Sequence, residues 1–146
     1  MKIAVFGTIP FSDLIKEGFQ KLGHEISNNN ADLIYANDPT GYHDATFLKM
    51  QNPKTQLILN VLDIPWHFSN IDNLYKTMIK RFFSKSDSIT AISYKVKKDL
   101  GKFFDSNIHE KIKVIYNPIQ NVNYDKKIKK NNSFLYVGRA NDPIKR

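Results

Sequence analysis

The chain has 146 residues, with 22 Lys and Arg against 14 Asp and Glu, so its formal net charge is +8. This length suits one ordinary domain that buries about two thirds of its unfolded surface. No cysteine is present, which excludes disulfides and thiolate chemistry. A membrane span would need a run of about 18 apolar residues, and the sequence has none. We therefore expect a soluble, cytoplasmic protein.

The positive charge comes almost entirely from lysine, because only Arg81, Arg139 and Arg146 are arginines. Basic surfaces attract phosphate-bearing partners. Lysines spread over a solvated surface are the favoured interpretation, since a bias towards AT-rich codons enriches Lys, Asn and Ile together. Peripheral contact with an anionic membrane at the inner face is the alternative, and we expect no nucleic-acid partner.

The first strand and helix have clear end signals. Lys2 to Phe6 is a short apolar run closed by Gly7, which predicts a strand. Ser12 is the expected N-cap of the following helix, and Gly23 is its expected end. The apolar positions of this helix fall on one face: Leu14, Ile15, Phe19 and Leu22.

Strand and helix signals go on alternating after this unit. Further strands are expected over residues 24–27, 31–36, 55–61, 88–92 and 111–116. Further helices are expected over residues 42–50, 71–83 and 94–104, the last with Ser93 as its N-cap. In the helix over 71–83, the expected core-facing residues are Leu74, Met78, Ile79, Phe82 and Phe83. The pattern predicts an α/β fold: a doubly wound, Rossmann-like parallel sheet.

We expect residues 1–118 to form this domain. Residues 119–132 are polar and rich in Asn and Lys, which is typical of a linker. Residues 133–146 begin with an apolar run that ends at Gly138, and we interpret them as the first strand and turn of a second domain. In a parallel sheet ligands bind at the carboxyl ends of strands. That rule selects the loops 7–11, 37–43, 62–67, 92–93 and 117–118.

Several stretches, taken in order, resemble the GT-B glycosyltransferases of the retaining family-4 type. Those stretches are Lys2–Val5, Leu22–Ile26, Ala31–Ala36, Ser86–Ser93 with Lys97–Leu100, Lys111–Pro118 and Phe134–Lys145. The resemblance implies the N-terminal half of an enzyme that moves a sugar from a nucleotide-diphosphate sugar to a hydroxyl of a glycan, lipid or small-molecule acceptor. It implies no metal and no other cofactor, and we expect the 146-residue chain alone to be inactive.

The same resemblance assigns donor-side residues. Arg139 and Lys145, after Gly138, would bind the leaving diphosphate. The contacts of a fixed guanidinium and an ammonium with phosphate become stronger as negative charge develops on the leaving group. The alternative is an exposed turn arginine and a solvated lysine. The loop that starts at Gly7 and Thr8 precedes a helix N-terminus, a natural anion site, so its backbone would approach the donor phosphates or the acceptor. A tight connection without ligand contact is equally open.

The residues expected on the acceptor side resemble the family motifs less closely. Leu62 replaces the family histidine, so Asp63 is a tentative catalytic residue that accepts from a sugar hydroxyl or merely caps a turn. Trp66 is either a platform for a sugar face or a buried aromatic. The other expected cleft residues are Asn37, Asp38, Ser93 and Asn117, with Tyr42 and His43 nearby.

For three of these residues a purely structural role is the alternative to ligand contact. For Asn37 and Asp38 we favour ordinary turn chemistry, and for Ser93 a helix cap. Asn117 resembles the family's interdomain hinge. The rival function is a standalone flavodoxin-like module that binds a nucleotide or phosphate without catalysis.

Overall fold

The computed structural model describes residues 1–7, 11–63, 73–104 and 106–116. The strands are β1 (Lys2–Phe6), β2 (Glu25–Ile26), β3 (Leu33–Ala36), β4 (Gln56–Val61), β5 (Ser88–Ala91) and β6 (Ile112–Val114). The helices are α1 (Phe11–Lys21), α2 (Pro39–Gln51), α3 (Asn73–Lys85), α4 (Tyr94–Phe103) and α5 (Ser106–His109). No helix in these ranges is both long and apolar enough to cross a bilayer.

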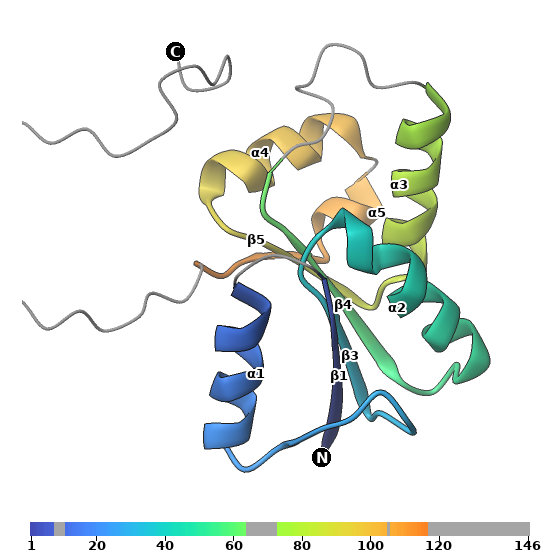
Figure 1. The fold of residues 1–146 in the computed structure, drawn as a ribbon. Helices are drawn as coiled ribbons and strands as arrows, with labels where there is room; N and C mark the ends of the chain where they lie inside the picture. The colour runs from blue at the N-terminus through green and yellow to red at the C-terminus, as the bar shows by residue number, and fades with distance from the viewer. Residues whose placement is uncertain (8–10, 64–72, 105, 117–146) are drawn as a thin grey trace, which may run out of the picture.

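The six strands form one sheet in the order β2-β1-β3-β4-β5-β6, and every neighbouring pair is parallel. The predicted α/β class and parallel sheet are therefore confirmed. In Figure 1 the strands β1, β3 and β4 run between α1 on the left and α2 and α3 on the right. Helices on both faces make the sheet doubly wound, as predicted.

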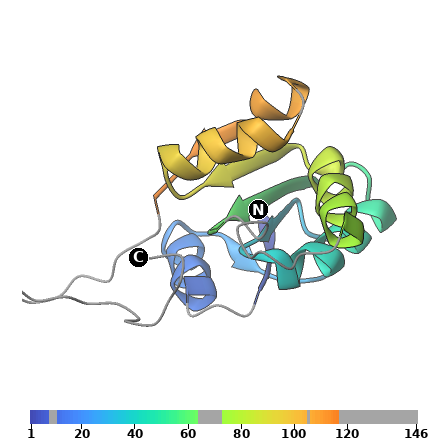
Figure 2. The same ribbon diagram turned by 90° about the horizontal axis from the view of Figure 1, so that it is seen from above.

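Crossover handedness explains which face each helix takes. From β3 to β6 the chain advances in one direction across the sheet, and from β1 to β2 it moves in the other. Right-handed crossovers therefore put α1 on one face and the later helices on the opposite face. We call these the α1 face and, after its longer helices α2, α3 and α4, the three-helix face; Figure 2 shows the same arrangement from above.

The larger core lies on the three-helix face. Its fully buried side chains include Ile34, Leu57 and Leu59 from the sheet, and burial of each stabilises the fold by about 1.5–3 kcal/mol. Phe83 of α3 packs against Tyr42 and Phe104, with ring centroids 5.7 and 5.0 Å apart. This aromatic cluster joins α2, α3 and the end of α4.

The smaller core lies on the α1 face. Ile3, Val5 and Leu33 are buried there, and Ile15 and Phe19 of α1 pack over them. Leu22, expected on the same apolar face, is 73% exposed because it follows the last residue of the helix.

Helix α1 ends as the sequence predicts. Gly23 has φ +79°, its N–H donates to the Gln20 carbonyl (2.9 Å), and the His24 N–H donates to the Phe19 carbonyl (3.0 Å). This pairing is a Schellman motif, which requires the left-handed residue that glycine supplies. The N-terminal prediction was wrong: α1 begins at Phe11, and the Ser12 hydroxyl donates to the Gly7 carbonyl (3.3 Å) instead of capping.

Helix α3 also departs from its predicted face. Ile79, Phe82 and Phe83 are buried as expected, but Leu74 is 73% and Met78 41% exposed. Leu74 and Met78, four positions apart, share a side of the helix that points away from the core, whereas Tyr75 packs against it. The short helix α5 was not predicted, and the proposed linker and second-domain strand lie outside the described residues.

Candidate functional site

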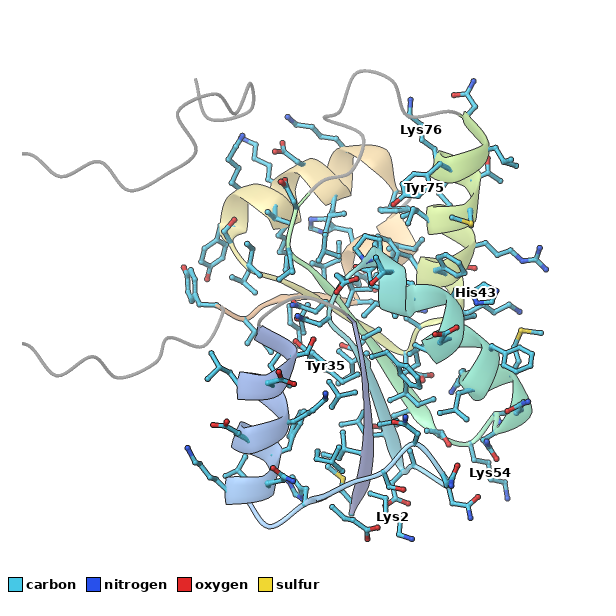
Figure 3. The ribbon with its side chains drawn as sticks, in the orientation of Figure 1. Lys2, Tyr35, His43, Lys54, Tyr75 and Lys76 are labelled. Carbon is cyan, nitrogen blue, oxygen red and sulfur yellow. The ribbon has the colours of Figure 1, made fainter. Side chains whose placement is uncertain are left out.

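The carboxyl ends of β1, β3, β4 and β5 meet at one edge of the sheet, which we call the carboxyl edge. The strand order reverses between β1 and β3, because β1 leads to β2 on one side and β3 leads to β4 on the other. A parallel sheet presents its ligand crevice at such a switch point. Lys2 and Lys54 mark the other end of the sheet, while Tyr75 and Lys76 lie towards the carboxyl edge (Figure 3).

The turn after β1 is packed against Asp38 and the first turn of α2 through two glycines. Gly7 has φ +129°, and a Cβ there would lie 2.6 Å from Asp38 Oδ2. A Cβ on Gly41 would lie 2.8 Å from the backbone nitrogen of Gly7. Neither position has room for a side chain, and Gly7 also needs a backbone conformation that other residues rarely adopt. The pair fixes the two turns relative to each other.

Asp38 begins α2. It is 2% exposed, and its carboxylate accepts hydrogen bonds from the Thr40 N–H (2.8 Å) and from the Thr40 hydroxyl. Asp38 is thus the N-cap and Pro39 stands in the first turn, a combination that suits a helix start. Asn37-Asp38-Pro39, interpreted from the sequence as turn chemistry, thus carries the chain from β3 directly into α2.

Three buried polar side chains form a chain of hydrogen bonds beneath the carboxyl edge, which we call the asparagine network. Asn60 Nδ2 donates to Asn37 Oδ1 (3.0 Å), and the Thr90 hydroxyl donates to Asn60 Oδ1 (2.7 Å). Their exposures are only 0% for Asn37, 2% for Asn60 and 3% for Thr90. The network therefore joins the ends of β3, β4 and β5 through side chains.

Asn37 Nδ2 has no hydrogen-bond partner among the described residues. A buried donor left unpaired costs about 1–3 kcal/mol, so native proteins seldom retain one without a partner or a role. Its place at the switch point puts this amide donor where a ligand of a parallel sheet is expected.

Two phenols border the network. Tyr42 is 1% exposed and its hydroxyl donates to the Asn60 carbonyl (2.6 Å). Burial raises the pKa of Tyr42 well above its ordinary value, and the Asp38 carboxylate raises it further. Burial also raises the pKa of Tyr35, while a hydrogen bond with Thr90 opposes that rise. Both phenols are therefore neutral at physiological pH.

Tyr42 was expected near the acceptor, but its ring is enclosed between α2 and α3 and cannot contact one. His43 is exposed on α2, with its Nδ1 3.2 Å from Asp44 Oδ1 (Figure 3). The geometry of the helix explains the difference: with about 3.6 residues per turn, Tyr42 and His43 point in different directions, and only Tyr42 faces the core.

Two other predicted site residues can be placed. Ser93 is the N-cap of α4, since its Oγ accepts from the Val96 N–H (3.2 Å), which confirms the simpler of its two interpretations. Asp63 is exposed beyond the end of β4, next to the half-buried Leu62. The remaining predicted residues lie outside the described part of the chain: Thr8, Trp66, Asn117, Gly138, Arg139 and Lys145.

Asn60 and Thr90 were not predicted as site residues. The available signal was a polar residue near the end of each of two strands, Gln56–Val61 and Ser88–Ala91, that are otherwise apolar at their centres. Within the described ranges, no three His, Asp or Glu side chains gather closely enough to hold a metal ion. The residues of the asparagine network offer a ligand hydrogen bonds from neutral amides and a hydroxyl.

No family model, curated protein or solved structure matches this chain. The glycosyltransferase resemblance consequently depends on the order of the sequence motifs, and the function that it implies is a prediction.

Proposed function

We propose that this chain provides the acceptor-side domain of a GT-B glycosyltransferase of the retaining type. The enzyme would transfer a sugar from a nucleotide-diphosphate sugar to an acceptor hydroxyl, independently of metal. The proposal joins the motif order of the sequence to an edge of the sheet that is suited to a hydroxyl-rich ligand.

The asparagine network carries the proposal. Sugar hydroxyls are recognised by neutral groups that both donate and accept, and Asn37, Asn60 and Thr90 supply amide and hydroxyl groups of this kind. The side-chain NH2 group of Asn37 has no partner among the described residues. A hydroxyl oxygen bound at the switch point would satisfy that donor.

The charge at the start of α2 favours a sugar over a phosphate there. A bare helix N-terminus attracts anions. In this chain the Asp38 carboxylate already accepts from the first turn of α2, so a phosphate at the same place would meet a negative charge. The proposal therefore assigns the donor diphosphate to Arg139 and Lys145, on the second domain, and the acceptor to the carboxyl edge.

Titration of the 146-residue chain and of any longer product of the same gene with a set of nucleotide-sugars tests this assignment. We expect no heat of binding with the 146-residue chain, because donor binding requires both walls of the cleft, and we expect binding and transfer with a two-domain product. Sub-micromolar binding of nucleotide-sugars to the 146-residue chain would contradict the proposal.

The strand order supports one alternative function, that of a flavodoxin-like binding module. The order β2-β1-β3-β4-β5 is that of flavodoxin-like folds, here with β6 added. Such a module would bind a flavin or nucleotide phosphate at the turn after β1 without catalysis. Titration with FMN distinguishes the two functions: quenching of FMN fluorescence on addition of the chain supports the rival, and unchanged fluorescence supports the transferase.

A further inference from the structure

A second groove, of about 460 Å³, lies on α4 and the short helix α5, and we call it the lysine groove. These helices stand at the β5 and β6 end of the sheet (Figure 2). No acidic residue of the described chain lines the groove, and it shares no residue with the asparagine network. Its lining residues are Tyr94, Lys97, Lys98, Gly101, Lys102 and His109.

Helix α4 presents this groove on a side that the core does not use. Val96 and Leu100 face the larger core and are buried there. The groove residues of α4 recur at positions 94, 97, 98, 101 and 102, a spacing that places them together on a different side of the helix. Packing of the helix on the sheet therefore does not explain why three lysines and a tyrosine share this side.

All three lysines keep hydrogen-bond donors for a ligand. Lys98 is exposed and has no partner among the described residues. Lys97 Nζ donates to the Ile112 carbonyl (2.7 Å), and Lys102 Nζ donates to Asp99 Oδ1 (3.3 Å). An ammonium group carries three donors, so each of these two lysines can make further hydrogen bonds.

The contact between Gly101 and His109 shapes the floor of the groove. A Cβ on Gly101 would lie 2.5 Å from His109 Cδ2, so the imidazole ring lies directly over the glycine. Glycine inside a helix is less stable than alanine. Here it leaves space that a side chain at this position would fill, and it lets α5 approach α4.

We propose that the lysine groove binds a terminal phosphate group, as found in a phosphate monoester. Such a group carries about two negative charges and three acceptor oxygens. These oxygens match the ammonium groups of the three lysines, and charge-assisted hydrogen bonds of this kind are the stronger ones. Tyr94 is 72% exposed at the first residue of α4, and its ring offers an apolar surface to the organic part of the ester.

This inference is independent of the sugar-transfer proposal. The diphosphate of a nucleotide-sugar is esterified at both ends and has no terminal phosphate group. The lysine groove also lies apart from the asparagine network, so loss of one site leaves the other intact.

NMR titration of the isotope-labelled chain tests the groove with inorganic phosphate, glucose 6-phosphate and glucose. Ionic strength is held constant, because salt screens exposed charges. We expect both phosphates to shift the backbone amides of Lys98, Gly101 and His109 saturably at millimolar concentrations, and glucose to shift none of them. Tyr94→Ala should weaken the binding of glucose 6-phosphate and leave that of inorganic phosphate unchanged.

Two further variants and a matched control separate a site from diffuse charge. Lys98→Ala should weaken the binding of both phosphates about tenfold. Gly101→Ala should weaken it as well, because the added Cβ displaces the His109 ring while α4 keeps a good helix former. Lys85→Ala removes the same charge from the exposed last turn of α3 and should leave the binding unchanged.

A second arm distinguishes a soluble ester from a lipid. The chain is sedimented with phosphatidylcholine vesicles that contain either phosphatidic acid, which has a terminal phosphate, or phosphatidylglycerol, which has a phosphate diester. Sedimentation with phosphatidic acid alone, lost in Lys98→Ala, would identify a lipid headgroup as the ligand. Saturable shifts without sedimentation would identify a soluble ester, and both results support the proposal.

The opposite results would overturn the proposal. They are the absence of binding in both arms, shifts that do not saturate, equal sedimentation with the two kinds of vesicle, and equal losses of affinity in Lys98→Ala and Lys85→Ala. Each would show that these lysines act only as part of a diffuse positive surface.

Discussion

The hydroxyl of Thr90 donates to Asn60 Oδ1 across 2.7 Å, and this bond joins β5 to β4 below the carboxyl edge. Asn60 in turn donates to Asn37 after β3. Three strand ends are thus held by side chains as well as by the backbone ladder. The same three residues supply the polar groups on which the proposed acceptor site depends.

Replacement of Thr90 by valine removes this donor and keeps the shape of the side chain. Because Asn60 Oδ1 would then be buried without its donor, we expect Thr90→Val to lower the free energy of unfolding by about 1–3 kcal/mol. Urea denaturation monitored by circular dichroism gives the value. Thr77→Val, on the exposed side of α3, is the matched control and should stay within about 0.5 kcal/mol of the parent. Equal costs for both variants would show that the network adds no stability.

Gly7→Ala tests the contact between the turns after β1 and β3. The added Cβ would meet Asp38 Oδ2 at 2.6 Å, and φ at this residue is +129°. We expect a loss of about 1–3 kcal/mol from backbone strain alone. Gly18→Ala is the control, because nothing lies within 4 Å of its added Cβ and alanine is the better helix former by about 0.5–1 kcal/mol. Thermal melts of the two variants should shift in opposite directions, and a neutral Gly7→Ala would refute the tight packing.

Tyr42→Phe tests the buried phenol and its pH dependence. At neutral pH the variant loses the hydrogen bond to the Asn60 carbonyl, and we expect a cost of about 1 kcal/mol. The pKa of Tyr42 is raised in the folded state, so its contribution is complete below pH 10.0, the ordinary value, and is lost as pH rises above it.

Denaturation between pH 9 and 11 should therefore show a shallower fall in stability for Tyr42→Phe than for the parent. Tyr94→Phe, at an exposed position on α4, should keep the slope of the parent. If the stability of Tyr42→Phe fell with pH as steeply as that of the parent, the fall could not be assigned to the Tyr42 phenol.

Local patterns were enough to predict the class of fold. Alternating strand and helix signals gave the six described strands and all helices except α5, because each depends on neighbouring residues. Gly23 was read correctly as a helix end for the same reason. The strand order could not be predicted, since it depends on packing between segments far apart in the sequence.

The site was less predictable than the fold. Asp38 and Ser93 are caps, which a short motif reveals. The asparagine network joins side chains that are 23 and 30 positions apart, so no local pattern marks it. Tyr42 and Leu74 were assigned to the wrong environment because the sequence does not show which side of each helix faces the sheet.

The most direct test of the proposed acceptor site is a titration of the isotope-labelled chain with methyl hexosides, and separately with UDP and GDP, followed by NMR of the backbone amides and the Asn37 side-chain amide. We predict that at least one methyl hexoside shifts the signals of Asn37 Nδ2, Gly7 and Gly41, and that the nucleotides leave them unchanged. Saturable shifts of these signals with UDP or GDP, and none with any hexoside, would contradict the account and favour a nucleotide-binding module.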